Sequence, residues 1–170
     1  MTARLTPRLL LLTCAAILLL APALASARIG GGIHYLRTLG DIKDSPDFDE
    51  DSIGFLGALD FDGNLIRLEA DLEAIPDYGG SSEFMWQPQG YALIGGVIYG
   101  GAGIGIGYLG DYGWQDPFFA LRAGVQFDLG SLDLDLFTSY RFQKAKDLET
   151  LQSDDLNSIT FGALVWFGGY

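Results

Sequence analysis

The chain has 170 residues, enough for one domain, and a formal net charge of −12 at pH 7. Asp and Glu outnumber Lys and Arg by 22 to 10, which argues against the clustered basic side chains that bind nucleic acid or anionic lipid surfaces. The single cysteine lies within the first 27 residues. An exported domain from this chain would therefore be held by packing or a closed hydrogen-bonded sheet, not by disulfides.

Residues 1–27 are predicted to form a cleaved secretory signal peptide. Arg4 and Arg8 supply its positive start, residues 9–20 its apolar run, and Ala25-Ser26-Ala27 its small cleavage residues. The alternative is an uncleaved membrane helix, but the apolar run is short for the roughly 20 residues that a span needs. Cleavage would leave residues 28–170 as one domain.

The next signal is an alternation of apolar and polar side chains. It runs through residues 65–74, 118–129 and 132–143, and a period of two over about ten residues predicts a strand with two unlike faces. After residue 27 no apolar stretch approaches the length of a membrane helix. The charged members of the polar faces are Arg67, Glu69, Asp71, Glu73, Arg122, Asp128, Asp133, Asp135 and Arg141.

Short turns and longer polar segments connect these strands alternately. Asp62-Gly63 is typical of a two-residue hairpin and would pair Phe55 with Ala70. Gly130-Ser131 would pair Phe127 with Leu134, and Gly95-Gly96 is a weaker third candidate. The long polar segments lie at about 40–51, 75–82, 110–117 and 144–157.

The pattern predicts eight strands in chain order. They are expected at about 29–39, 52–61, 64–74, 83–94, 97–109, 118–129, 132–143 and 158–170. Long loops would then lie at one end, with the tight turns and both termini at the other, as in bacterial outer-membrane barrels. The predicted fold class is all-β: an eight-stranded antiparallel up-and-down transmembrane β-barrel.

In this architecture the chain resembles the small eight-stranded outer-membrane barrels of the OmpA/OmpX type. The resemblance covers residues 28–170 and rests on no subfamily motif. It implies the outer membrane of a Gram-negative-type bacterium, contact with outer-membrane lipids, and periplasmic N- and C-termini. The last strand, ending at Tyr170, resembles the sorting signal that the barrel-assembly machinery reads.

The alternation does not by itself decide which face meets water. A soluble lipocalin-like barrel would turn the apolar face inward. Lys after residue 27 occurs only at Lys43, Lys144 and Lys146, in loops or at a loop edge, which favours the lipid-facing assignment. Two points stay open: which face of the last strand meets lipid, and whether Pro88 marks a bulge or a loop boundary.

An eight-stranded barrel has an interior just wide enough for side chains. We therefore expect the charged side chains to fill it as a paired network, in a protein with a structural or surface-interaction role. The alternative is a narrow cation-preferring channel, because carboxylates outnumber arginines in this set.

Catalysis is less favoured. His34 is the only histidine, and a lipid-modifying enzyme would need partners for it that the spacing does not reveal. No metal or cofactor site is expected. Loops 41–51 and 144–157 carry most of the loop charge and are candidates for contact with an extracellular partner.

Overall fold

The computed structural model describes residues 27–39, 49–61, 66–80, 83–110, 112–143 and 157–168. The predicted signal peptide, except Ala27, lies outside these ranges, as do Tyr170 and most of loops 41–51 and 144–157.

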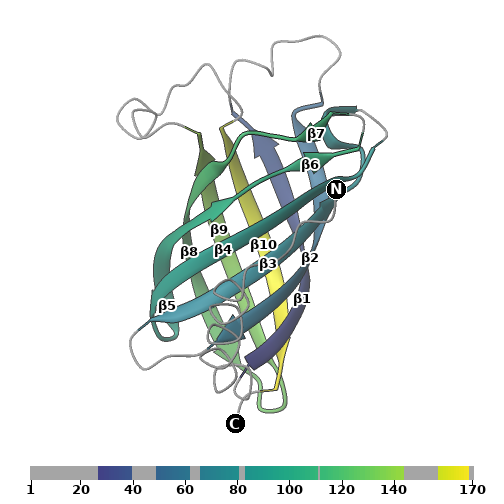
Figure 1. Ribbon diagram of the computed structural model, residues 1–170. Coiled ribbons are helices and arrows are strands. Elements are labelled where there is room, and N and C mark those ends of the chain that lie inside the picture. The colour runs from purple at the N-terminus through teal and green to yellow at the C-terminus, as the bar shows by residue number, and fades with distance from the viewer. Residues whose placement is uncertain are drawn as a thin grey trace, which may run out of the picture.

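Eight long strands and a short hairpin make up the described part of the chain (Figure 1). The long strands are β1 (Ala27–Thr38), β2 (Asp51–Phe61), β3 (Arg67–Ile75), β4 (Met85–Gly95), β5 (Ile98–Gly105), β8 (Phe118–Asp128), β9 (Asp133–Phe142) and β10 (Ser158–Phe167). The hairpin consists of β6 (Tyr108–Leu109) and β7 (Gly113–Trp114), and a single 3-10 turn, η2 (Tyr78–Gly80), precedes β4.

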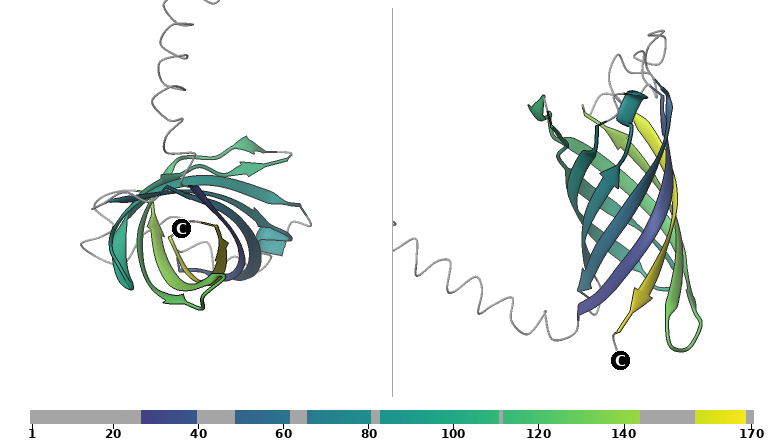
Figure 2. Two further views of the ribbon diagram at one scale, coloured as in Figure 1. Left: turned by 90° about the horizontal axis from the view of Figure 1, so that it is seen from below. Right: turned by 90° about the vertical axis from the view of Figure 1, so that its right-hand side faces the viewer.

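Antiparallel pairing closes the sheet into a barrel. Each long strand pairs with its neighbours in the chain, and β1 pairs with β10 to complete the ring. Figure 2 shows the resulting cylinder from below. Closure leaves none of the eight long strands as a sheet edge, as a strand-built membrane span requires. The predicted fold class is confirmed. No described helix has the length and hydropathy to cross a membrane.

The two faces of the wall differ in chemistry. Large apolar side chains point outward, including Ile33, Phe55 and Leu72, which are 57%, 54% and 48% exposed. The charged side chains point inward, where they lie among buried apolar side chains such as Leu36 and Leu56. An apolar outer wall around a charged interior is the reverse of a lipocalin-like barrel, so the structure contradicts the soluble alternative.

The structure shows which face of the last strand points outward, a point that the sequence leaves open. Leu164 and Trp166 are buried in the interior, at 0% and 1% exposure, whereas Phe161 and Phe167 are more than half exposed on the outer wall. The outer face of β10 therefore carries the odd-numbered side chains.

The turn at Gly130-Ser131 is as predicted. Phe127 pairs with Leu134, and the Leu129 N–H donates a hydrogen bond to the Leu132 carbonyl over 3.0 Å. Gly130 has φ +91°, a conformation that glycine adopts without steric cost.

The register that a two-residue turn at Asp62-Gly63 would impose is wrong, although the turn residues themselves lie outside the described ranges. Phe55 pairs with Ala74, not Ala70, so the register is shifted by four residues. An even shift leaves every side chain on its own face, and the hydrophobic pattern cannot detect it. The stagger needed to close a barrel is a separate constraint.

Pro88 lies within β4, but the interruption falls on the strand that pairs with it. β4 runs through Pro88 without interruption, but β5 ends at Gly105 and the ladder resumes at Tyr108 in β6. The Ile106 N–H donates to the Pro88 carbonyl over 3.2 Å, and proline has no N–H to return the bond. The Gly95-Gly96 turn is also wider than two residues, because Gly95 itself pairs with Tyr99.

Candidate functional site

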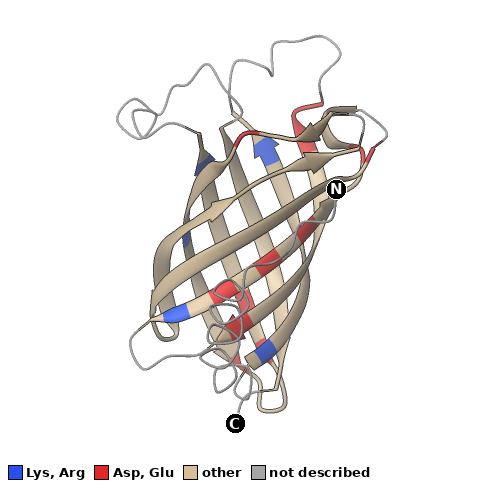
Figure 3. Ribbon diagram, viewed as in Figure 1, with Lys and Arg blue, Asp and Glu red and all other residues tan. Residues whose placement is uncertain are grey.

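The candidate site is the charged interior of the barrel. Of the nine predicted charged residues, the structure buries six at 4% exposure or less: Glu69, Asp71, Glu73, Arg122, Asp135 and Arg141. The side chains of Arg67 and Asp133 are 10% and 26% exposed. Figure 3 shows acidic segments following one another along β3, which crosses the wall of the barrel that faces the viewer.

Asp128 does not belong to this interior set, which corrects the sequence-based assignment. It is exposed at the end of β8, and its Oδ1 accepts a hydrogen bond of 2.7 Å from the Gly130 N–H. The alternation places Asp128 on the inward face, but the strand leaves the barrel there and the carboxylate serves the turn.

Strands β3 and β9 lie on opposite sides of the ring, four places apart in the strand order, and charged side chains join them through the centre. Arg141 of β9 forms an ion pair with Glu73 of β3, both nearly fully buried. Arg141 also donates to Gln87 Oε1 over 2.9 Å, and its guanidinium lies 5.4 Å from the centre of the Phe118 ring.

Arg122 of β8 forms the next contact with β3. It pairs with Glu69 and, over 2.8 Å, with Asp71, and all three side chains are fully buried. Its guanidinium stands 3.7 Å from the centre of the Tyr91 ring and 4.4 Å from that of Phe137. Carboxylates and aromatic faces together surround the cation, as cation–π geometry favours.

Arg67 extends the network from β3 toward β9. Its guanidinium lies 3.5 Å from Glu69 and 3.7 Å from Asp135, and 4.3 Å from the centre of the Tyr99 ring. The Tyr99 hydroxyl in turn donates to Asp135 over 2.7 Å. The Asp135 carboxylate thus contacts both the Arg67 guanidinium and the Tyr99 hydroxyl, and the guanidinium also stacks on the Tyr99 ring.

Arg28 and Asp60 complete the network near the tight-turn end, and sequence reasoning missed both. Arg28 forms an ion pair with Asp60 of the adjacent strand and another, over 2.7 Å, with Asp133. It lies 5.5 Å from the Trp166 ring centre. Asp60 could have been assigned to the inward face from the apolar–polar alternation of β2. Arg28 could not, because it directly follows the predicted cleavage site and precedes any periodic pattern.

Glycines on neighbouring strands make room for these rings. A Cβ at Gly103 would collide with the Tyr91 ring, and one at Gly124 with the Tyr99 ring. Gly105 likewise faces the Phe118 ring, whereas a Cβ at Gly101 would meet the backbone of β4. The glycines that face rings therefore allow large aromatic side chains inside a narrow cylinder.

His34 also faces the interior. It is 2% exposed, its Nε2 lies 3.8 Å from Glu73 Oε2, and Gly54 provides the space for its ring. Within the described ranges, no group of three or more His, Cys, Asp or Glu residues is placed to hold a metal ion.

The loop-side mouth holds a recess with about 450 Å³ of space, part of it open to solvent. Arg141, Phe118 and Tyr78 of η2 are among the residues that line it. Burial raises the pKa of the Tyr78 hydroxyl above that of a free phenol.

Comparison with solved structures bears on this architecture. Neisserial surface protein A matches with a TM-score of 0.61 at 12% identity, over 84% of this chain and 97% of that one. This is the fold of a small outer-membrane barrel. A de novo designed transmembrane β-barrel matches with a TM-score of 0.51 at 10% identity, over 83% of this chain and 95% of the design. No family model and no curated protein sequence matches. At these identities the likeness concerns the fold, and function has to be argued from the site.

Proposed function

We propose that this protein is an integral outer-membrane barrel with a structural or surface-interaction role and a sealed interior. The observation that carries the proposal is the set of four interior arginines, each paired with carboxylates and stacked on an aromatic ring: Arg28, Arg67, Arg122 and Arg141. Pairs that reach from β3 to β8 and β9 occupy the centre, where a channel would have to run.

Planar-bilayer recording of the purified protein tests this proposal. We expect no stable porin-sized conductance from the wild type. The double variant Arg122→Ala/Arg141→Ala removes the two most central cations, and we expect it to leak, while Arg37→Ala, at an exposed pair with Glu50, should stay closed. Stable wild-type openings of porin size would refute the sealed interior.

A narrow cation-preferring path is the second candidate, and a charge imbalance favours it. The described interior holds six carboxylates, Asp60, Glu69, Asp71, Glu73, Asp133 and Asp135, against the four arginines named above. An acidic lining favours cations. Small conductance steps whose reversal potential in a KCl gradient follows K⁺ would support this candidate over the sealed barrel.

The location and orientation belong to the proposal as well. The outward apolar wall supports a membrane position, and the start of β1 lies beside the end of β10, with Ile29 paired to Phe167. We infer that this end, with both termini, faces the periplasm. Epitope tags placed after residue 27 and after Tyr170 should be shielded from antibody in intact cells and reached after the outer membrane is opened.

Two partners follow from the same inference. The barrel-assembly machinery would bind the last strand through its end at Tyr170, and deletion of Tyr170 should lower the amount of assembled barrel. Loops 41–51 and 144–157 would face outward and meet an extracellular partner. A variant with both loops shortened should assemble normally but lose that binding.

The proposed role is non-catalytic. His34 is enclosed by the barrel wall beside Glu73, out of reach of a lipid on the outer surface. Lipid isolated from cells that express His34→Ala should match lipid from cells that express the wild type. Loss of a lipid modification in this variant would favour an enzyme instead.

A further inference from the structure

One wall of the barrel differs from the others on its outer surface. On β1 and β2 the outward positions carry large side chains such as Ile29, Ile53 and Phe55, each more than half exposed. On β3, β4 and β5 the outer surface forms a shallow groove, widely open to its surroundings, with about 830 Å³ of space that includes this open region. Its outward lining consists of small residues at Gly90, Ala92 and Ala102 and of Leu68 and Ile104, and the adjacent inward-facing residues Glu69, Tyr91 and Gly103 also border it.

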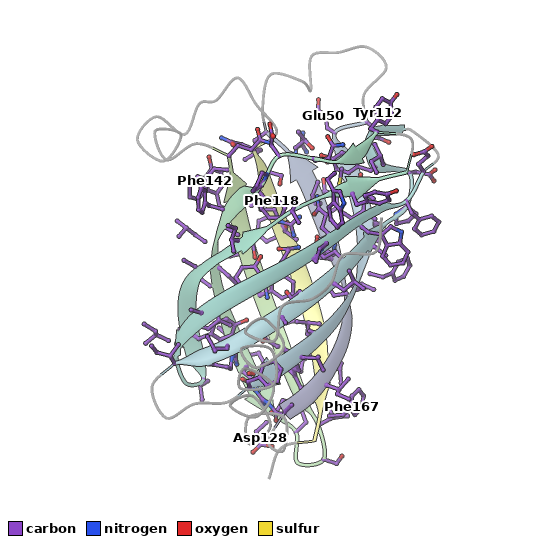
Figure 4. All side chains as sticks on the ribbon, in the orientation of Figure 1. Glu50, Tyr112, Phe118, Asp128, Phe142 and Phe167 are labelled. Atoms are coloured by element: carbon purple, nitrogen blue, oxygen red, sulfur yellow. The ribbon has the colours of Figure 1, made fainter. Side chains whose placement is uncertain are left out.

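Exposed aromatic side chains stand above this groove toward the loop end. Trp86 of β4 pairs with Tyr108 of β6, and the Tyr108 and Trp114 rings meet edge to face at 5.1 Å. Trp86 and Trp114 are 44% and 63% exposed, and Tyr112 at the hairpin tip is 75% exposed. Tyr112 is labelled beside β7 at the loop end in Figure 4.

The β6–β7 hairpin leans outward from the wall. A bulge accompanies this: two residues lie between Gly105 and Tyr108 on one strand, whereas three lie between Trp114 and Phe118 on the other. An extra residue on one strand bends it and increases its twist. Both views in Figure 2 show the hairpin extending beyond the cylinder.

The groove and the aromatic hairpin share one strand face. Trp86 and Gly90 both point outward on β4, four residues apart, or roughly 13 Å at the usual rise of a strand. Trp and Tyr favour the level of lipid headgroups, because their rings are apolar and their N–H or O–H is polar. From that level an acyl chain would run down the wall toward Gly90 and Ala92.

We propose that this wall holds a membrane lipid, with one acyl chain in the β3–β4–β5 groove and the headgroup level beside the β6–β7 hairpin. The occupant is a lipid because the outward side chains of the groove, such as Leu68, Ala92 and Ile104, continue the exposed apolar wall of the barrel, and exposed aromatic rings stand at its loop end. Exposed apolar surface of this extent needs a cover. The inference rests on the proposed membrane location.

Two glycines give a matched pair of variants. Gly90 and Gly57 both lie on the outer wall, and a Cβ at either position would meet nothing within 4 Å. Gly90→Phe fills the groove, whereas Gly57→Phe adds the same ring to the outer face of β2. Each variant and the wild type would be reconstituted in vesicles of phosphatidylethanolamine and phosphatidylglycerol, and the lipid retained after gentle detergent release counted by native mass spectrometry.

We expect the wild type and Gly57→Phe to retain a lipid and Gly90→Phe to retain at least tenfold less. Replacement of both hairpin rings, Tyr108→Ala/Trp114→Ala, should lower retention as well. Equal retention by Gly90→Phe and Gly57→Phe would overturn the proposal. A wild-type dimer that Gly90→Phe abolishes would show that a second copy of the chain fills the groove.

Vesicle flotation separates this inference from the proposed function. If the wild type floats with the vesicles but retains no lipid, only the lipid site is refuted. If the wild type does not float with them, the membrane location fails and the lipid site fails with it.

Discussion

Arg141 and Glu73 form a buried ion pair that joins β9 to β3 through the centre of the barrel. Two chain segments 68 residues apart are thereby tied together inside a narrow cylinder. A buried charge that loses its partner stays uncompensated, which costs far more than the pair itself contributes. The pair therefore fixes the two walls relative to each other as much as it stabilises the fold.

Glu73→Gln removes the carboxylate and leaves the Arg141 cation buried. We expect the free energy of unfolding to fall by about 3–5 kcal/mol, the usual result of breaking a buried pair. Urea unfolding in phospholipid vesicles, followed by tryptophan fluorescence, measures the change.

Glu50→Gln is the control for this prediction. Glu50 pairs with Arg37 at the surface, over 3.2 Å, and water screens such pairs. It should leave the urea midpoint unchanged. An equal loss in both variants would mean that the interior pair has no special role. The double variant Glu73→Leu/Arg141→Met should regain part of the loss, because no unpaired charge remains.

Gly103→Ala tests the packing of rings against glycine. The added methyl would collide with the Tyr91 ring, on which Arg122 stacks, and overpacking of this kind costs about 1–3 kcal/mol. Gly90→Ala on the adjacent strand meets nothing and should be neutral. Heat-modifiable gel migration and urea midpoints compare the two, and equal stability would contradict the packing account.

Leu136→Arg tests the lipid face. Leu136 points outward on β9 and is 46% exposed, so the new charge would lie in hydrocarbon. We expect a loss of about 2–4 kcal/mol near the bilayer midplane. Ser131→Arg, in the exposed turn before β9, is the control and should fold as the wild type does. Full stability of Leu136→Arg in vesicles would place that face in water.

The sequence predicts the strands well, because a period of two is read directly from residues such as Leu134, Asp135 and Leu136. It also predicts the Gly130-Ser131 register, since few residues other than glycine adopt φ +91° in a two-residue turn. It fails at Asp62-Gly63 because an even shift in register preserves the alternation of faces. Strand pairing around the whole ring decides that register.

The sequence predicts which charged side chains lie in the interior better than it predicts their pairing. The alternation assigns Glu69 and Arg122 to the polar face, but which carboxylate meets which arginine depends on the closed ring and its stagger. Arg28 has no periodic context at the start of its strand. The even-numbered face of β10, with Trp166, carries no charge to mark it as inward, so the alternation alone does not assign the two faces of the last strand.

Site-directed spin labelling tests the orientation of the two faces most directly. The only cysteine lies in the predicted signal peptide, so single cysteines at Leu72 and Ile33 can be labelled cleanly in the protein after removal of residues 1–27, with Ser131 in the exposed turn as the water-accessible control. In vesicles, labels at Leu72 and Ile33 should collide readily with dissolved oxygen and rarely with a water-soluble nickel complex. Labels at those two positions that respond to nickel as Ser131 does, and not to oxygen, would contradict a barrel with its apolar face in lipid.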